Sequence, residues 1–112
     1  MKPCKVFWTN EATLDLEEII GYISQDRISP AIALYKAVKS RCLLLKNIPD
    51  KYRIVPELFD LGITSYREIV HSPYRIIFRL ACLKVHIMAV ADSRRDFETF
   101  IFNRLLRDRS TR

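Results

Sequence analysis

Five arginines lie where their guanidinium groups could bind an anionic target. Two of them, Arg75 and Arg79, alternate with apolar residues in SPYRIIFRL, residues 72–80. That period of two is typical of a β-strand with one apolar face and one partly charged face. The other three are Arg67, Arg94 and Arg95. A guanidinium forms charge-assisted, often bidentate hydrogen bonds with phosphate or carboxylate oxygens, so we predict that these five arginines bind the target. A solvated, salt-bridged face is the alternative.

Groups that could transfer a proton are scarce beside these arginines. His71 could carry a proton near neutral pH, although a surface residue at a strand end is the simpler interpretation. We interpret Glu68 as an ion-pair partner of a neighbouring arginine, because a lone strand carboxylate seldom acts alone. The residues alone therefore leave any catalytic group unassigned.

No metal or cofactor site is expected. His71 and His86 share no ligand-like spacing with the cysteines. The three cysteines are Cys4, Cys42 and Cys82, an odd and widely spaced set without a CxxC motif. We interpret them as reduced, mostly buried thiols of a cytoplasmic protein.

The composition indicates a single globular domain over residues 1–112. Hydrophobic residues make up 49% of the chain, and glycine and proline together are scarce. No uninterrupted apolar run approaches the roughly 20 residues that a membrane-spanning helix needs, so no membrane segment is expected. The first 18 residues reach acidic side chains too early for a secretory signal.

The net charge of +6 is unevenly distributed along the chain. Residues 1–26 carry two basic and five acidic side chains, whereas residues 27–112 carry 17 basic and eight acidic ones. A basic excess of that size favours an anionic partner, either nucleic acid or an acidic protein segment.

The apolar periodicity indicates an α+β domain in the order β-α-α-β-β-β. Asn10 should cap the first helix, and Ser29 with Pro30 should cap and begin the second. The break at residues 26–28 is short enough to fold the helices into an antiparallel hairpin, which would pack on a small, curved, mainly antiparallel sheet. The expected elements are a strand at 4–8, helices within 10–47, an ordered loop at 48–64, strands at 66–72, 74–81 and 84–91, and a final helix or loosely packed tail at 94–108.

The register of the strand at 74–81 predicts which side chains face the helices. Those residues are Tyr74, Ile76, Phe78 and Leu80, with Arg75 and Arg79 on the opposite face. We expect Arg75 and Arg95 to be exposed near strand ends and to form one basic site. Neutralising either should then abolish function and leave the fold intact. The residues interpreted as core are Phe7, Trp8, Phe97 and Phe100.

Four segments in order resemble toxins of the RelE/ParE superfamily, the stable half of bacterial type II toxin–antitoxin pairs. The segments are DLEEIIGYISQD from residue 15, IPDKYRIVPEL from 48, YREIVHSPYRIIFRL from 66 and MAVADSRRDF from 88. The long helical hairpin and the P…R…PEL loop resemble the ParE branch more than the compact RelE-type ribonucleases.

RelE-like members cut mRNA on the ribosome. That cleavage needs a base for the 2′-hydroxyl, an acid for the leaving oxygen and cations around the transition state. The positions that match by resemblance are Arg67, Arg75 and Arg95, with His71 as a further candidate. Two features depart from the pattern, because Ile69 replaces a second basic residue and the segment 100–102 has no tyrosine.

ParE-like members inhibit DNA gyrase, and the resemblance then implies no covalent chemistry by the toxin. We therefore expect a growth-inhibiting, plasmid-stabilising toxin that acts on gyrase, is not an enzyme and is neutralised by a cognate antitoxin. Such an antitoxin places an apolar helix in a groove and acidic residues on basic ones. Operator DNA would be contacted only through the antitoxin. The alternatives are a ribosome-dependent mRNA endonuclease, with the ribosome and mRNA as partners, and a non-catalytic nucleic-acid-binding module.

Overall fold

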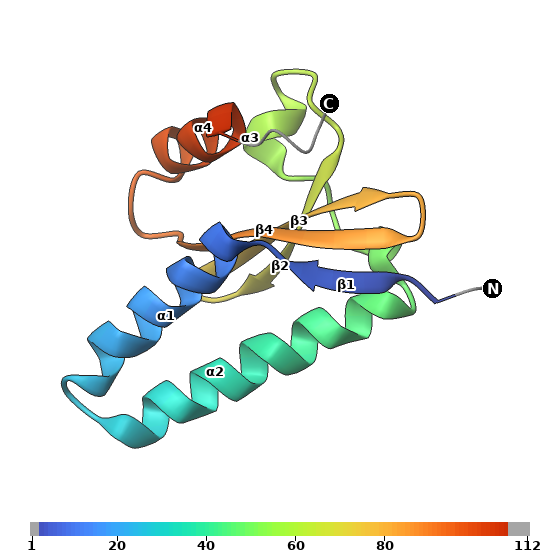
Figure 1. Ribbon diagram of the computed structural model, residues 1–112. Helices are drawn as coiled ribbons and strands as arrows, with labels where there is room; N and C mark the ends of the chain where they lie inside the picture. The colour runs from blue at the N-terminus through green and yellow to red at the C-terminus, as the bar shows by residue number, and fades with distance from the viewer. Residues whose placement is uncertain (1–2, 108–112) are drawn as a thin grey trace.

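A four-stranded sheet with helices on both faces forms the fold (Figure 1). The computed structural model describes residues 3–107. The elements are β1 (Lys5–Trp8), α1 (Asn10–Ser24), α2 (Ile28–Leu43), α3 (Pro56–Phe59), β2 (Tyr66–His71), β3 (Tyr74–Ala81), β4 (Lys84–Asp92) and α4 (Phe97–Arg107), with 3-10 turns at Leu44–Lys46 and Pro49–Lys51. Asp108, the last residue of the predicted final segment, lies outside the described residues. None of the helices among residues 3–107 is both long and apolar enough to cross a membrane.

The predicted α+β architecture is confirmed. β2, β3 and β4 form an antiparallel meander, and β1 pairs with β4 in parallel, which gives the strand order β1-β4-β3-β2. The parallel pair is possible because α1 and α2 form the crossover that returns the chain to the same sheet.

The helix starts differ from the sequence prediction by one or two residues. Thr9, and not Asn10, caps α1, since its hydroxyl accepts a hydrogen bond of 3.2 Å from the backbone N–H of Ala12. α2 begins at Ile28, and Ser29 and Pro30 lie inside its first turn. Proline is tolerated there because the first N–H groups of a helix have no partner within the helix.

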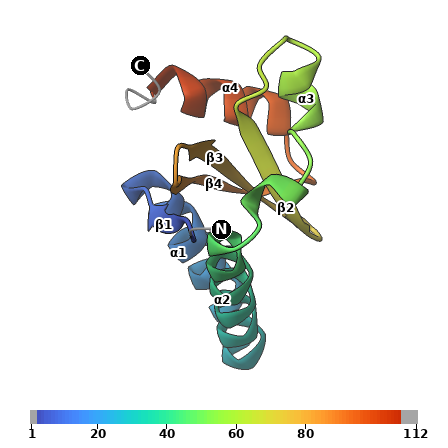
Figure 2. The same cartoon turned by 90° about the vertical axis from the view of Figure 1, so that its right-hand side faces the viewer.

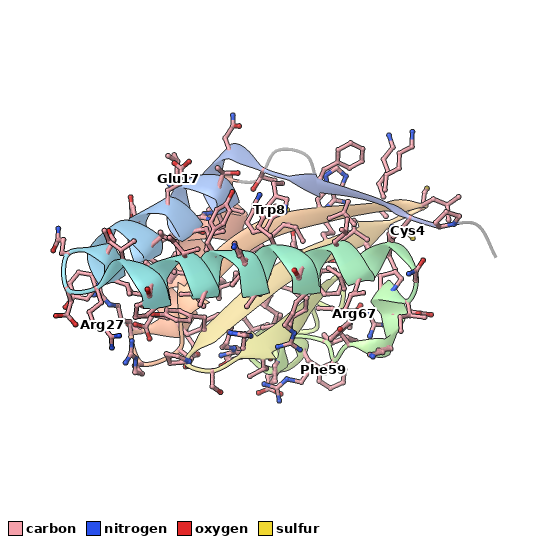
Figure 3. The ribbon with its side chains drawn as sticks, turned by 90° about the horizontal axis from the view of Figure 1, so that it is seen from below. Cys4, Trp8, Glu17, Arg27, Phe59 and Arg67 are labelled. Atoms are coloured by element: carbon pink, nitrogen blue, oxygen red, sulfur yellow. The ribbon has the colours of Figure 1, made fainter. Side chains whose placement is uncertain are left out.

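The main core lies between the helical hairpin and one face of the sheet. Ile76 and Phe78 are fully buried there and Leu80 packs against them, as the strand register predicted. Trp8, also predicted as core, packs against this cluster, and the Lys39 ammonium lies 4.3 Å from the centre of its ring. Figure 3, which views the hairpin side, shows Trp8 beside α2.

The opposite face of the sheet is covered by α3 and α4 (Figure 2). Ile77 of β3 is buried there in a second cluster with Phe97 and Ile101 of α4 and Leu58 of α3. The segment at 94–108 is thus a packed helix over Phe97–Arg107 and not a loose tail. This layer changes the environment of Arg75, as described below.

Two core predictions were wrong. Phe7 is 41% exposed because it points to the sheet face away from the hairpin, near the edge that α3 and α4 leave open. Cys42 is buried, but Cys82 is exposed in the turn between β3 and β4 and Cys4 is only half-buried, so the thiols are not mostly buried. All three are free.

The segment 48–64 is ordered by pairing with β2. The backbone N–H of Val55 donates to the carbonyl of Tyr66 at 3.0 Å, and that of Glu68 donates to the carbonyl of Arg53 at 3.0 Å. Pro56 then begins α3, where its fixed φ suits the first helical turn. The pairing holds Glu57, the next residue, over the sheet beside β3.

Candidate functional site

Arg75 lies at the centre of a closed ion-pair network. Its Nη1 and Nη2 donate to the carboxylate of Glu57 at 2.9 and 2.7 Å, and its Nε donates to Glu68 Oε1 at 2.7 Å. The other oxygen of Glu68 accepts from Arg53 Nε at 2.6 Å. The Arg75 guanidinium also lies 3.7 Å from the centre of the Phe97 ring. All three guanidinium nitrogens of Arg75 are therefore occupied within the protein.

The electrostatics of the network favour its charged state. The hydrogen bond from Arg75 lowers the pKa of Glu57 below its ordinary value of 4.5, against the opposing effect of burial. Burial alone would lower the pKa of Arg75, but hydrogen bonds to Glu57 and Glu68 raise it above its ordinary value. The Glu68 side chain is fully buried, and both of its carboxyl oxygens are hydrogen-bonded, one to Arg75 and one to Arg53, so neither acceptor is left unpaired.

This geometry corrects the expected exposure of Arg75. The residue does face away from the hairpin as predicted, but only 8% of it is exposed, because α3 supplies Glu57 and α4 supplies Phe97 above it. The interpretation of Glu68 as an ion-pair partner is confirmed, as is that of Phe97 as core.

Arg67 lies on the other face of the sheet. Its Cα partner in β3 is Phe78, which belongs to the hairpin core, and its Nη1 donates to the carbonyl of Tyr52 at 2.6 Å. Figure 3 shows it on the hairpin side, near the C-terminal end of α2. Ile69 faces the same core and is fully buried. The structure therefore does not bring Arg67 and Arg75 together.

His71 is also on the hairpin side, at the end of β2. Its Nδ1 lies 3.4 Å from Nη1 of Arg41, and Arg41 Nη1 donates to the carbonyl of Val70 at 2.7 Å. Arg79 is half-buried on the α3–α4 side, where its strand partners are Tyr66 and His86. Neither residue lies next to Arg75 in the pairing register.

Arg94 and Arg95 are exposed in the turn between β4 and α4. Arg94 donates to both carboxylate oxygens of Asp92, at 2.9 and 2.8 Å, and these bonds lower the pKa of Asp92 and raise that of Arg94. Asp96 instead caps the start of α4 by accepting from the N–H and hydroxyl of Thr99 at 3.1 and 2.7 Å. Arg95 stays exposed, which agrees with its prediction.

A groove of about 1160 Å³ opens beside these two arginines, between α1 and α4. Its lining combines apolar side chains with charged groups of both signs. The lining residues used below are Ile19, Tyr22 and Ile23 of α1, Phe100 of α4, and Arg94 and Arg95 of the turn. Arg75 does not line it, so the predicted single site of Arg75 and Arg95 is divided between a buried network and an open groove.

Arg104 is a buried charge that the sequence prediction missed. It donates to Asp15 of α1 and to the carbonyl of Met88 at 2.8 Å, and thereby ties α4 to α1 and β4. A signal was present in the sequence, because Arg104 recurs on the helical stripe of Phe97 and Ile101 that α4 buries. Within residues 3–107, no cluster of three or more histidine, cysteine or acidic residues could hold a metal ion.

Comparisons with known proteins agree with this fold. A family model described as the ParE toxin of the type II toxin–antitoxin system parDE matches residues 6–97. A solved structure of a chromosomal ParDE toxin–antitoxin system from P. aeruginosa is similar, with a TM-score of 0.65 and 16% sequence identity over 80% of this chain and 95% of that chain. A comparison with curated protein sequences finds no match. Because the family model matches most of the chain, this protein belongs to the ParE toxin family of type II toxin–antitoxin systems.

Proposed function

We propose that this ParE-family toxin arrests bacterial growth by inhibiting DNA gyrase, and that its own side chains make or break no covalent bond. The observation that carries the proposal is the neutralisation of Arg75 by Glu57 and Glu68. This arginine matches a basic position of the ribonuclease branch, where a cation has to stabilise the charge that develops on phosphate.

A second argument concerns the groups that would complete a ribonuclease site. Arg67 and His71 lie on the face of the sheet opposite to Arg75. Ile69 is buried in the hairpin core, and neither an isoleucine nor a phenylalanine at 100–102 can transfer a proton. Cleavage of mRNA would therefore lack both a concentrated positive charge and an acid–base pair.

The exposed turn arginines are the proposed target contacts. Arg95 is exposed and keeps its guanidinium available for charge-assisted hydrogen bonds with an anionic or acidic group. Arg94 can contribute beside it, although Asp92 already binds its guanidinium. We assign Arg75 to the support of this region through Phe97, which begins α4 directly after the turn.

The groove between α1 and α4 suits the antitoxin that a member of this family has as its partner. Tyr22 is 73% exposed and lies with Ile19, Ile23 and Phe100 along the groove, which gives an apolar strip for an amphipathic helix. Arg94 and Arg95 at one end would bind acidic residues of the same segment. Toxin, antitoxin and gyrase would meet in the cytoplasm, with operator DNA bound through the antitoxin.

The test measures two activities of one purified protein. Gyrase supercoiling of relaxed plasmid is assayed with increasing toxin, and mRNA ends are mapped by primer extension in cells that express it. We expect dose-dependent loss of supercoiling, weaker for Arg95→Ala than for the matched control Arg107→Ala, and no new mRNA ends. Codon-phased mRNA cuts together with unimpaired supercoiling would overturn the proposal.

A further inference from the structure

A second basic surface lies on the sheet itself, away from the groove. We name it the basic sheet face and define it by Lys5 and Phe7 of β1, Lys84 and His86 of β4, and Arg79 of β3. The pairing register places Lys5 opposite Lys84, Phe7 opposite His86, and Arg79 opposite His86 on its other side. None of the five lines the groove between α1 and α4.

All five side chains project from the same face of the sheet. Val6 of β1 and Val85 of β4 belong to the hairpin cluster, so their strand neighbours point to the opposite face, since side chains alternate along a strand. In Figure 1, the N-terminal ends of β1 and β4 and the C-terminal end of β3 extend to the right of α3 and α4. Lys5, Phe7 and Lys84 are accordingly exposed.

The described residues of the strands bring only basic groups to this surface. Among the described residues, β1 and β3 carry no carboxylate, the only one on β4 is Asp92 at its far end, and Glu68 of β2 is fully buried in the Arg75 network. Lys5 and Lys84 are Cα partners on the neighbouring strands β1 and β4, and neighbouring strands lie about 4.8 Å apart. An anion between them would relieve the repulsion of two ammonium groups.

The surface also carries an open aromatic stack. The rings of Phe7 and His86 lie 5.5 Å apart with an angle of 22° between their planes, and Phe7 is 41% exposed. Lysine on an edge strand commonly protects it from pairing with another chain. That explanation covers Lys5 only, because β4 is an interior strand, and it does not explain an exposed phenylalanine.

We propose that the basic sheet face binds a strand of nucleic acid, with phosphates on Lys5 and Lys84 and a base stacked on Phe7. Alternating cations and exposed rings are how proteins bind single strands without reading their sequence. An acidic protein segment would use the lysines but would gain little from a flat exposed ring. The proposal goes beyond gyrase inhibition and requires no gyrase to be tested.

The experiment measures fluorescence anisotropy of a labelled oligothymidylate of about 15 nucleotides with the whole 112-residue chain across a salt series. The affinity of the unmodified protein should fall with salt. In Lys5→Gln/Lys84→Gln, the slope of log K against log salt should flatten by about 0.7 per lysine. Phe7→Leu should weaken binding on the order of tenfold with the slope unchanged.

The matched control is Lys36→Gln/Lys51→Gln, which removes the same charge from exposed positions on other elements. It should leave the slope near that of the unmodified protein.

Equal flattening in both double variants would overturn the proposal, since binding would then follow net charge alone. Competition by poly-glutamate as effective as unlabelled oligothymidylate, with no effect of Phe7→Leu, would also overturn it in favour of a protein partner. Binding that persists in a protein that fails to inhibit gyrase would leave this inference standing and refute the proposed function only.

Discussion

Arg104 donates hydrogen bonds to both carboxylate oxygens of Asp15, at 2.7 and 2.8 Å, although 89 residues separate them in sequence. Asp15 Oδ2 also accepts from the backbone N–H of Val90 at 3.0 Å. One carboxylate thus joins α1, β4 and α4. Because α4 covers Arg75 through Phe97, the same pair supports the buried network around Arg75.

Arg104→Ala should destabilise the fold strongly. The Arg104 side chain is only 6% exposed, and its removal leaves the largely buried carboxylate of Asp15 without its cation. Breaking such a pair costs about 3–5 kcal/mol, which corresponds to a drop of roughly 10 °C or more in melting temperature. Thermal unfolding followed by circular dichroism measures it. Arg107→Ala is the control, because its side chain is 63% exposed, and a similar loss in both variants would contradict the assignment.

Arg75→Ala should lose toxicity through loss of the folded state. It would leave the fully buried carboxylate of Glu68 with only the exposed Arg53 as a partner, at a cost of about 3–5 kcal/mol. Arg75→Lys keeps the charge but cannot bind Glu57 and Glu68 with a planar fork, so it should be intermediate. Urea unfolding measures the free energy of unfolding of each variant and so ranks them by stability. A stable and non-toxic Arg75→Ala protein would restore the sequence-based prediction of a direct target contact.

The Glu57–Arg75 pair also predicts a dependence of stability on pH. The pKa of Glu57 is lowered in the folded state, so the pair stabilises the fold fully above the ordinary carboxyl value of 4.5. That stabilisation is lost as pH falls through the lower folded pKa. The melting temperature of Glu57→Gln should therefore fall less steeply on acidification than that of the unmodified protein. If the melting temperatures of the two proteins fell equally steeply with pH, other carboxylates would account for the acid sensitivity of the fold.

The periodic parts of the fold were predictable from the sequence. Alternation in β3 gave the correct face for Ile76, Phe78 and Arg75. A strand has only two faces, and the apolar residues identify the one that packs on the hairpin. The helical hairpin followed from the short break at residues 26–28. These predictions depend on neighbours in sequence, which a single chain displays directly.

The site was less predictable, because it depends on partners that are distant in sequence. Alternation shows that Arg75 opposes the apolar face but not that α3 and α4 cover it, and burial turns an apparent binding residue into a structural one. The four-residue α3 is too short to leave a periodic signal. The Asp15–Arg104 pair spans most of the chain, so local patterns do not identify it.

The cysteines should react with a thiol reagent in order of exposure. Burial raises the pKa of Cys42 to about 12, so almost no thiolate forms at neutral pH. Cys82 is exposed in the turn between β3 and β4 and should react first, with Cys4 more slowly. A stopped-flow absorbance assay with Ellman's reagent should show Cys42 reacting only in denaturant. Cys82→Ser should remove the fast phase, and rapid modification of Cys42 in the native protein would contradict its burial.

Induced expression should arrest bacterial growth, and co-expression of the adjacent gene should relieve the arrest if it encodes the antitoxin.

Arg95→Ala is the informative variant. Its side chain is exposed, so the stability cost should be about 0–1 kcal/mol, whereas a lost charge-assisted contact with the target costs roughly 1.5–3 kcal/mol per bond. The variant should therefore fold normally and lose most of its toxicity. Growth curves at matched protein levels, with melting temperatures of the purified proteins, separate the two effects. Lys36→Ala is the control for charge, because it removes one exposed cation from α2. An Arg95→Ala protein that is as toxic as the control would show that the turn arginines are only a solvated surface.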